Sequence, residues 1–157
     1  MSETNNNAAK LKDTIIEVIE DIFENMLFMD AIYKEVVEVK EIPDHVEVRL
    51  LVNHPFPGEF VFQAPKQFVS QAAGTLFMAE EEDINEGMFN DVMNELLNTI
   101  SGRIMAKITP EGKSFKLGLP EKMLSESFIL DDNESDLDFY FEIDDEFMIN
   151  IKFYDMI

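Results

Sequence analysis

The chain has 157 residues, of which 46% are hydrophobic, and its 33 acidic and 12 basic residues give a formal net charge of −21. This length suits one domain that buries its own core, and the absence of cysteine excludes disulfides, thiolate catalysis and cysteine-ligated metals. So acidic a chain repels nucleic acid and anionic membrane surfaces. We therefore expect residues 1–157 to form a single domain that binds neither.

The N-terminal residues 1–7 are polar and lack the basic and apolar regions of a secretory signal. We predict that they form a disordered tail. No apolar stretch of the chain is long enough to span a bilayer, and the lack of cysteine fits a reducing compartment. A cytoplasmic location is therefore expected.

The first predicted helix covers about residues 8–29, with Asn7 as a candidate N-cap. Its apolar residues recur at intervals of three and four, which is the period of an amphipathic helix. They are Ile15, Val18, Ile19, Ile22 and Met26.

Strand patterns follow this helix. Residues 33–40 are rich in β-branched side chains, and residues 45–52 alternate between apolar and polar, which predicts a strand with one buried face. The prolines and glycine of residues 53–58 predict a turn. Residues 59–64 are predicted to return as the next strand.

Two helices are predicted in the middle of the chain. The shorter covers residues 66–78 and is entered through Pro65, whose fixed φ suits the start of a helix. An acidic loop over residues 80–83 leads to the longer helix, at about residues 84–107.

Both ends of the longer helix carry recognisable signals. Asp83 and Glu86 have the spacing of a capping box, in which two side chains satisfy free backbone N–H groups. Residues 109–112, which include a proline and a glycine, are expected to end the helix.

The C-terminal part has the alternation of β-strands, in residues 115–119, 137–143 and 147–153. The last two runs are separated by three acidic residues and are predicted to form a hairpin. We therefore expect an α+β fold, with long helices packed on a mostly antiparallel sheet.

One face of the longer helix carries polar residues. At about 100° per residue, Asp91, Glu95, Asn98 and Gly102 fall within roughly 60° of one another. The apolar residues gather on the opposite side, so this stripe is expected to point away from the core.

A solvated helix face is one explanation of the stripe. Asn and Gly, however, are poor helix formers, and Gly costs about 1 kcal/mol relative to Ala in a helix interior. A missing side chain one turn beyond Asn98 would let the backbone of another protein approach closely. The stripe is therefore a candidate contact surface for a partner.

The segment 91–102, DVMNELLNTISG, resembles the signature of the CheC/CheX/FliY phosphatases. That signature is Asp or Ser, three residues, Glu, two residues, Asn, and a Pro roughly twenty residues later, whose place Pro120 takes here. The resemblance implies a CheC-like fold and a CheX-type enzyme. Such an enzyme would remove the aspartyl-phosphate from a phosphorylated CheY-type response regulator and so end a chemotaxis signal.

The resemblance also implies a role for each residue of the signature. Asn98 would orient the attacking water in the regulator's active site, and Glu95 would pair with the regulator's active-site Lys, so both are candidate catalytic residues. Asp91 and Gly102 would contact the partner, and Pro120 would shape a turn. The chain itself would bind no metal or other cofactor, because the Mg²⁺ is expected in the partner's active site.

The first predicted helix carries Asp13, Glu17 and Glu20 at the spacing of the signature, 78 residues earlier. This suggests an internal duplication with a pseudo-twofold axis, and chance similarity between two amphipathic helices is the alternative. Position 20 holds Glu rather than Asn, and a carboxylate there would repel phosphate. We therefore expect one working site, on the second helix, and the first helix carries at most a decayed second site.

Several other features of the sequence allow further interpretations. Residues 80–83 lack the spaced ligands and the glycine of a calcium loop, so a solvated linker is favoured. His45 and His54 suggest neither a metal site nor a nucleophile–base pair. A non-catalytic interaction module, as in flagellar-switch relatives, stays open, as does a phosphatase for a receiver domain outside chemotaxis.

The resemblance implies a homodimer joined through the sheets of its subunits. The alternating aromatic residues 147–154 could form a sheet edge that needs a partner strand. A strand covered within its own chain is the alternative.

Overall fold

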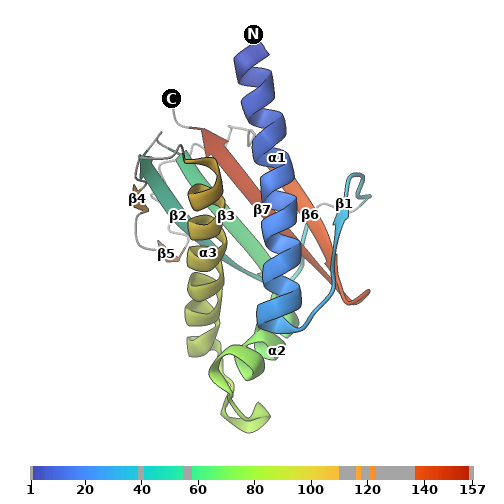
Figure 1. Cartoon of the computed structure of the whole chain (residues 1–157). Helices are drawn as coiled ribbons and strands as arrows, with labels where there is room; N and C mark the ends of the chain where they lie inside the picture. The colour runs from blue at the N-terminus through green and yellow to red at the C-terminus, as the bar shows by residue number, and fades with distance from the viewer. Residues whose placement is uncertain are drawn as a thin grey trace.

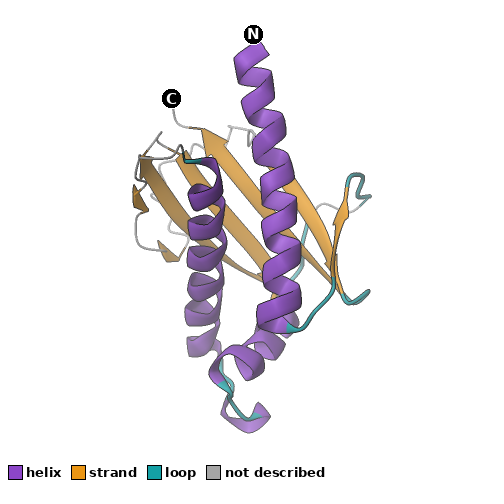
Figure 2. Cartoon of the chain, viewed as in Figure 1, coloured by secondary structure: helices purple, strands orange, loops and turns teal. Residues whose placement is uncertain are grey.

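A computed structural model of the chain describes residues 2–38, 41–54, 58–109, 116–117, 121–122 and 137–155. Its helices form one layer against one face of an antiparallel sheet (Figures 1 and 2). The expected α+β class and the CheC-like arrangement of helices on an antiparallel sheet are therefore confirmed.

The helices follow the apolar periods of the sequence closely. They are α1 (Ser2–Ile22), the π-helical turn η1 (Phe23–Leu27), α2 (Lys66–Phe77), the 3₁₀ turn η2 (Glu81–Asp83) and α3 (Glu86–Ile108). The two long helices, α1 and α3, lie side by side and run in opposite directions across the sheet (Figure 1).

The sheet has the strand order β1-β6-β7-β3-β2-β4, and β5 also pairs with β2. Its strands are β1 (Ala31–Lys34), β2 (His45–His54), β3 (Gly58–Pro65), β4 (Lys116–Leu117), β5 (Glu121–Lys122), β6 (Leu137–Ile143) and β7 (Phe147–Asp155). The hairpins β2–β3 and β6–β7 meet where β3 pairs with β7, so this pairing joins the two halves of the sheet.

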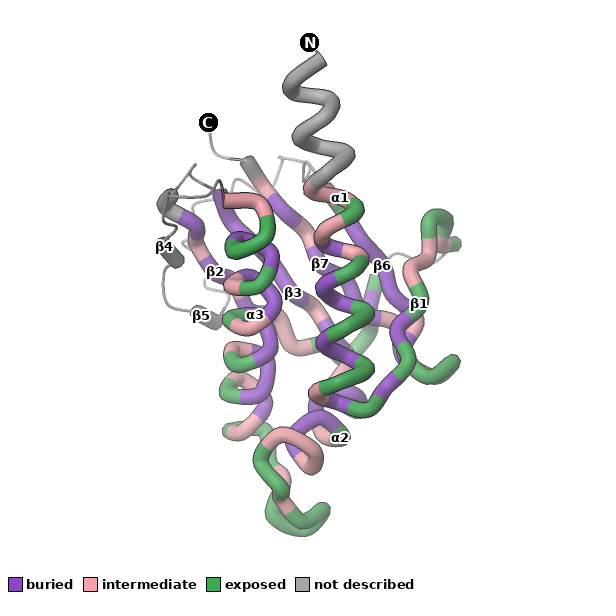
Figure 3. Tube along the Cα trace, in the orientation of Figure 1, coloured by how far each residue is buried: buried purple, intermediate pink, exposed green. Residues whose placement is uncertain are grey.

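The core lies between the helices and the sheet. Alternate residues of β2, β3, β6 and β7 point toward the helices, and the register places Val48 opposite Phe62 and Phe60 opposite Phe153. In Figure 3 the buried sides of α1 and α3 face the sheet and their exposed sides face solvent. Because one side of α3 is buried against the core, the candidate residues on its other side face solvent.

Aromatic rings connect η1, which follows α1, with α2 and with the start of β7. The ring centroids of Phe23 in η1 and Phe68 in α2 are 5.7 Å apart, and those of Phe68 and Phe147 in β7 are 6.0 Å apart. All three side chains are buried. Because offset and edge-on aromatic contacts add to the effect of burial, this cluster fixes the end of α1 against α2 and the sheet.

The opposite face of the sheet holds polar groups that are paired. Arg49 on β2 forms an ion pair of 2.9 Å with the buried Glu59 on β3. The buried Asn150 on β7 donates a 2.9 Å hydrogen bond to the carbonyl of Phe139 on β6. Pairing offsets the cost of removing these groups from water.

The ends of the first helix differ from the prediction. The helix begins at Ser2, so residues 2–7 are helical rather than a disordered tail and Asn7 does not cap the start. Once a helix has nucleated, each added residue gains a backbone hydrogen bond, which lets a polar segment extend it. At the other end the α-helix stops at Ile22 and continues as the π-helical turn η1.

Two further local predictions were wrong. The first strand covers Ala31–Lys34 and does not continue through residues 35–38. The capping box of Asp83 and Glu86 does not form, because Asn85 is the N-cap of α3 and Glu86 instead accepts a 3.0 Å hydrogen bond from Lys66.

The other strand and helix predictions agree with the structure where it describes them. The strands near 45–52 and 59–64, the helices near 66–78 and 84–107, and the C-terminal hairpin are all present. The turn predicted at residues 53–58 is shorter, because Asn53 and His54 belong to β2 and Gly58 begins β3. Residues 55–57, 110–112, 115 and 119 lie outside the described residues.

The arrangement of the sheet bears on two predictions of symmetry. β7 is paired on both sides, with β3 and β6, so residues 147–154 do not form the expected sheet edge. The 78-residue offset would equate β3 with β6, whereas β3 pairs with β7 at the centre of the sheet. The pseudo-twofold repeat is therefore not confirmed.

Replacing Phe68 by Ala should lower the free energy of unfolding by about 3–5 kcal/mol, because it removes a buried ring that touches two others. The measurement is urea unfolding followed by circular dichroism. Phe77→Ala, at an exposed position of the same helix, is the control and should change stability by less than about 1 kcal/mol. Equal losses in the two variants would contradict the described packing.

Candidate active site

The polar stripe on α3 points away from the core, as the sequence predicted. Asp91, Glu95 and Asn98 are exposed, and Gly102 is half-buried. The opposite side of the same helix is buried, at Phe89, Val92, Met93, Leu96, Leu97, Ile100, Ile104 and Met105. One helix therefore anchors itself in the core and presents the four residues to solvent.

The polar side chains of the stripe have no bonding partners among the described residues. Within the part of the chain that the structure describes, neither Asp91 nor Glu95 makes an ion pair, and the side chain of Asn98 makes no hydrogen bond. The stripe therefore offers two free negative charges and one neutral amide, and the amide can both donate and accept hydrogen bonds.

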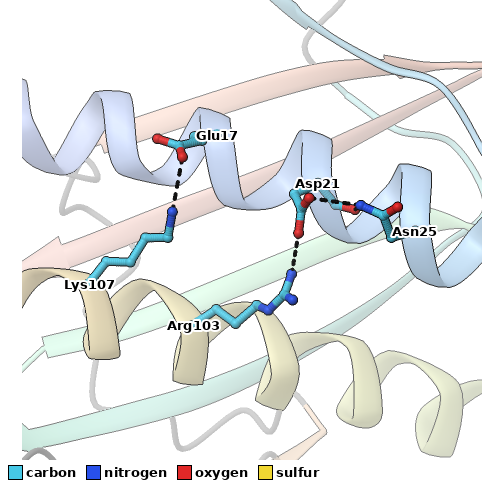
Figure 4. Close-up of polar contacts among 5 residues, drawn as sticks. All are labelled: Glu17, Asp21, Asn25, Arg103 and Lys107. Carbon is cyan, nitrogen blue, oxygen red and sulfur yellow. Dashed lines mark hydrogen bonds and ion pairs between the residues drawn. The ribbon is translucent and has the colours of Figure 1, made fainter.

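Two ion pairs connect α3 with α1. Lys107 contacts Glu17 at 3.0 Å, and Arg103 contacts Asp21 at 2.6 Å (Figure 4). Each pair is exposed to solvent and stabilises the fold by only about 0.2–1 kcal/mol. Their effect is positional, because a step of four residues along α1 matches a step of four residues back along α3.

Asn25, in the π-helical turn η1, adds a contact to Asp21. Its amide nitrogen donates a 2.8 Å hydrogen bond to the carboxylate of Asp21 and a 3.0 Å hydrogen bond to the Asp21 carbonyl (Figure 4). The contacts made by Asp21, Asn25, Arg103 and Lys107 were not predicted from the sequence. The available signal was two rows of complementary residues, each with the four-residue spacing of one helix face.

The side chain that follows Asn98 binds the backbone of the preceding turn. The hydroxyl of Thr99 donates a 2.9 Å hydrogen bond to the carbonyl of Glu95. Such a bond competes locally with the helical pattern and often bends a helix slightly. It holds the turn that carries Glu95 and Asn98.

The acids of the first helix form a separate surface. Asp13, Glu17 and Glu20 are exposed, as predicted, and with Ile16, Asp21 and Glu24 they line a hollow of about 330 Å³. Glu17 is the residue that binds Lys107. This surface has carboxylates where α3 has Asn98, so it lacks a neutral group that could approach a phosphoryl oxygen.

A second hollow, of about 390 Å³, lies near the starts of α2 and α3, and its lining includes His45, Lys66 and Glu86. Lys66 donates to Glu86 and lies 3.5 Å from Asp44, and these carboxylates raise the pKa of its ammonium group. The contact ties the first residue of α2 to the first residue of α3.

The other residues singled out in the sequence show no sign of a metal or catalytic site in the described structure. Glu81 to Asp83 form the exposed 3₁₀ turn η2, and His45 hydrogen-bonds to the carbonyl of Ile42 at 2.6 Å. The described residues contain no group of His, Asp and Glu side chains that could hold a metal ion. Nor does any described helix have the length and apolar character needed to cross a membrane. Pro120 lies outside the described residues.

A comparison with protein families matches residues 51–143 to the family of the chemotaxis phosphatase CheX. The matched region is more than half of the chain and includes the whole of α3. The chain belongs to the CheX family. The resemblance in segment 91–102 is thereby confirmed.

Solved structures of the CheX family share the fold. CheX from Desulfovibrio desulfuricans has a TM-score of 0.68 and 15% identity, over 92% of this chain and 97% of that protein. CheX from Borrelia burgdorferi, in a complex with CheY, BeF₃ and Mg²⁺, has a TM-score of 0.61 and 15% identity, over 90% and 95%.

The fold also occurs outside CheX. The middle domain of FliM from Vibrio alginolyticus has a TM-score of 0.59 and 14% identity, over 92% of this chain and 90% of that one. A search of curated proteins found no match. At such identities, similarity to these structures establishes the fold, and the role of individual residues has to be argued from the site.

Replacing Glu95 or Asn98 by Ala should change the free energy of unfolding by less than about 0.5 kcal/mol, because both side chains are exposed and Ala favours helix. Urea unfolding of the two variants checks this. Leu96→Ala, at a buried position between them, should cost about 2–5 kcal/mol. A large loss at position 98 would show that the stripe supports the fold.

Proposed function

We propose that this CheX-family chain hydrolyses the aspartyl-phosphate of a phosphorylated CheY-type response regulator, and so ends a chemotaxis signal. Membership of a family of chemotaxis phosphatases supports this proposal. So does the solved relative from Borrelia burgdorferi, whose complex contains CheY. The observation that carries it is the exposed, unpaired position of Glu95 and Asn98 on one face of α3.

In this mechanism Asn98 orients the water that attacks the phosphoryl group. Its amide accepts a hydrogen bond from the water and donates one to a phosphoryl oxygen. Water forms a new P–O bond, the bond to the aspartyl oxygen breaks, and the products are inorganic phosphate and the regulator's free carboxylate, with a proton released to solvent. Because phosphoryl transfer depends mostly on positioning and charge, one oriented amide can accelerate it.

Charge decides which residue approaches the phosphoryl group and which binds beside it. The amide of Asn98 is neutral and is not repelled by phosphate, whereas the free carboxylate of Glu95, one turn earlier, suits the regulator's active-site Lys. Asp91 continues the negative stripe as a docking contact, and Gly102 leaves room for the partner's backbone.

The same reasoning gives a single working site. Position 20 on α1 holds an exposed Glu where α3 has Asn98, and a carboxylate would repel both the phosphate and the acidic pocket of a receiver. The chain supplies no metal ligands in this proposal. The Mg²⁺ that neutralises charge in the reaction belongs to the regulator.

The proposal also covers where the reaction takes place and how the chain assembles. We place the reaction in the cytoplasm, where chemotaxis regulators act, and we infer a homodimer of this chain. Since β7 is an interior strand, the dimer would have to use another strand or surface. Size-exclusion chromatography with light scattering distinguishes a dimer from a monomer.

A non-catalytic interaction module is the second candidate function, and the similarity to the FliM middle domain favours it. A module of this kind would dock a partner through the acidic helix face and would not need the amide of Asn98. A phosphatase for a receiver outside chemotaxis is a further variant, because the stripe would contact the receiver's active site rather than its output.

Replacing Asn98 by Ala should reduce the stimulated dephosphorylation of a phosphorylated CheY-type receiver by about 10²-fold or more, because the attacking water loses its orientation. The assay follows loss of phosphate from the receiver with Mg²⁺ present. Asn90→Ala, the same substitution at a half-buried position of α3 outside the stripe, should keep full activity. Full activity in Asn98→Ala would exclude this mechanism, and binding without acceleration by the natural chain would favour the module.

A further inference from the structure

Two amides of α3, one turn apart, lack hydrogen-bond partners. The side-chain oxygen of the half-buried Asn94 is itself buried, and no described residue donates a hydrogen bond to it. The exposed side chain of Asn98 makes no hydrogen bond to a described residue either. A buried acceptor without a partner lowers stability, and Asn is a poor helix former. Neither helix propensity nor bonding within the described chain therefore explains an Asn at position 94.

The spacing of the two residues makes their side chains neighbours. Residues four apart in a helix lie on one face, with Cβ atoms about 5–6 Å apart. Helical side chains lean toward the N-terminus, which brings the Asn98 amide toward residue 94. The amide nitrogen of Asn98 carries two N–H groups, and the side-chain oxygen of Asn94 is an acceptor. Rotation of the exposed Asn98 side chain can therefore place one of its N–H groups on the unused oxygen of Asn94.

Other polar residues of α3 are less suited to bind the Asn98 amide. The hydroxyl of Ser101 is also buried without a partner among the described residues. It follows Asn98 by three residues, however, and helical side chains lean away from that direction. Asn90 lies two turns before Asn98, and its amide is not among the buried groups that lack a partner. Asn94 alone combines an unused buried acceptor with a position one turn before Asn98.

The backbone around Asn98 is already held in place. The hydroxyl of Thr99 donates a 2.9 Å hydrogen bond to the carbonyl of Glu95, and the side chains of Leu96 and Leu97 are buried in the core. The freedom that remains is the rotation of the Asn98 side chain. An amide that orients water has to keep one orientation during the reaction, because a small misplacement reduces the rate sharply. A hydrogen bond from Asn98 to Asn94 would supply that orientation.

We propose that Asn94 is a positioning residue, whose side-chain oxygen accepts a hydrogen bond from the Asn98 amide when a phosphorylated receiver covers the stripe. This inference rests on the proposed function and adds a residue to the same site. Asn98 then donates one N–H to Asn94 and the other to a phosphoryl oxygen, and its own oxygen accepts a hydrogen bond from the attacking water. Asn94 acts through Asn98 and contacts neither the water nor the phosphoryl group.

Replacing Asn94 by Leu tests this role, because the substitution removes the acceptor and keeps a branched side chain. The kcat of stimulated dephosphorylation should fall about tenfold, while the KM for the phosphorylated receiver stays unchanged. The unfolding midpoint should stay the same or rise, since Leu favours helix and leaves no buried acceptor unpaired. A purely structural residue would not lose rate without losing stability. Asn94→Asp keeps an acceptor oxygen and should recover most of the rate.

Asn90→Leu is the matched control, because it makes the same substitution at a half-buried position one turn earlier in α3. It should leave kcat unchanged. An unchanged kcat in Asn94→Leu, or an equal loss in Asn90→Leu, would overturn the inference. A higher KM with an unchanged kcat would also overturn it, because Asn94 would then be a docking contact. If Asn94→Leu lowers the unfolding midpoint, Asn94→Ala takes its place in the same assay.

A second readout separates this inference from the proposed function. If the natural chain does not accelerate dephosphorylation, the proposed function fails. Proton–nitrogen NMR of the complex with a beryllofluoride-activated CheY-type receiver then tests the contact alone. One side-chain N–H signal of Asn98 should move downfield in the complex, Asn94→Leu should abolish this shift, and Asn90→Leu should keep it. The same shift in all three proteins, no shift in any of them, or no complex at all overturns the inference.

Discussion

The burial of one side of α3 is the constraint on which the site depends. Each apolar side chain on that side contributes about 1.5–3 kcal/mol when it leaves water, and several of them pack between the sheet and α1. Asn98 and Gly102 on the opposite stripe cost much less than this burial contributes, because relative to Ala in a helix Asn is less favourable by only several tenths of a kcal/mol and Gly by about 1 kcal/mol. The buried side of α3 therefore holds the helix in place even though its outward face is poor for helix stability. That outward face is free to contact a partner.

The charges near this face leave its acidic residues without a cationic partner among the described residues. The two basic residues of α3 that could neutralise it, Arg103 and Lys107, are bound by carboxylates of α1. Glu95 is left without an intramolecular cation among the described residues, and Asn98 is the neutral group beside it. A partner with an exposed Lys and a bound phosphoryl group would complement both residues. The net charge of −21 also opposes the approach of phosphate to any of the surrounding carboxylates.

Much of the fold and the location of the stripe could be predicted from the sequence because both follow from periodicity. The alternation in β2, β6 and β7 and the period of α3 record which side of each element is buried. Features that depend on contacts between distant residues could not be predicted. Glu86 binds Lys66 rather than forming a capping box, and the interior position of β7 depends on its pairing with β3.

The π-helical turn η1 belongs to the same class of features, since no local pattern distinguishes it from a regular helix end. The candidate site lies between these extremes. The residues of the stripe were identified from their spacing and their resemblance to a family. The ion pairs that hold α3 beside α1 are visible only once the helices are packed.

The proposed mechanism requires a neutral amide at position 98, and Asn98→Asp replaces that amide with a carboxylate. This substitution keeps the size and shape of the side chain and changes its charge. The measurement is the rate of phosphate loss from a phosphorylated CheY-type receiver, with urea unfolding to establish that the fold is intact. We predict a stable variant whose stimulated dephosphorylation falls by about 10²-fold or more. Undiminished activity in a stable Asn98→Asp variant would contradict it.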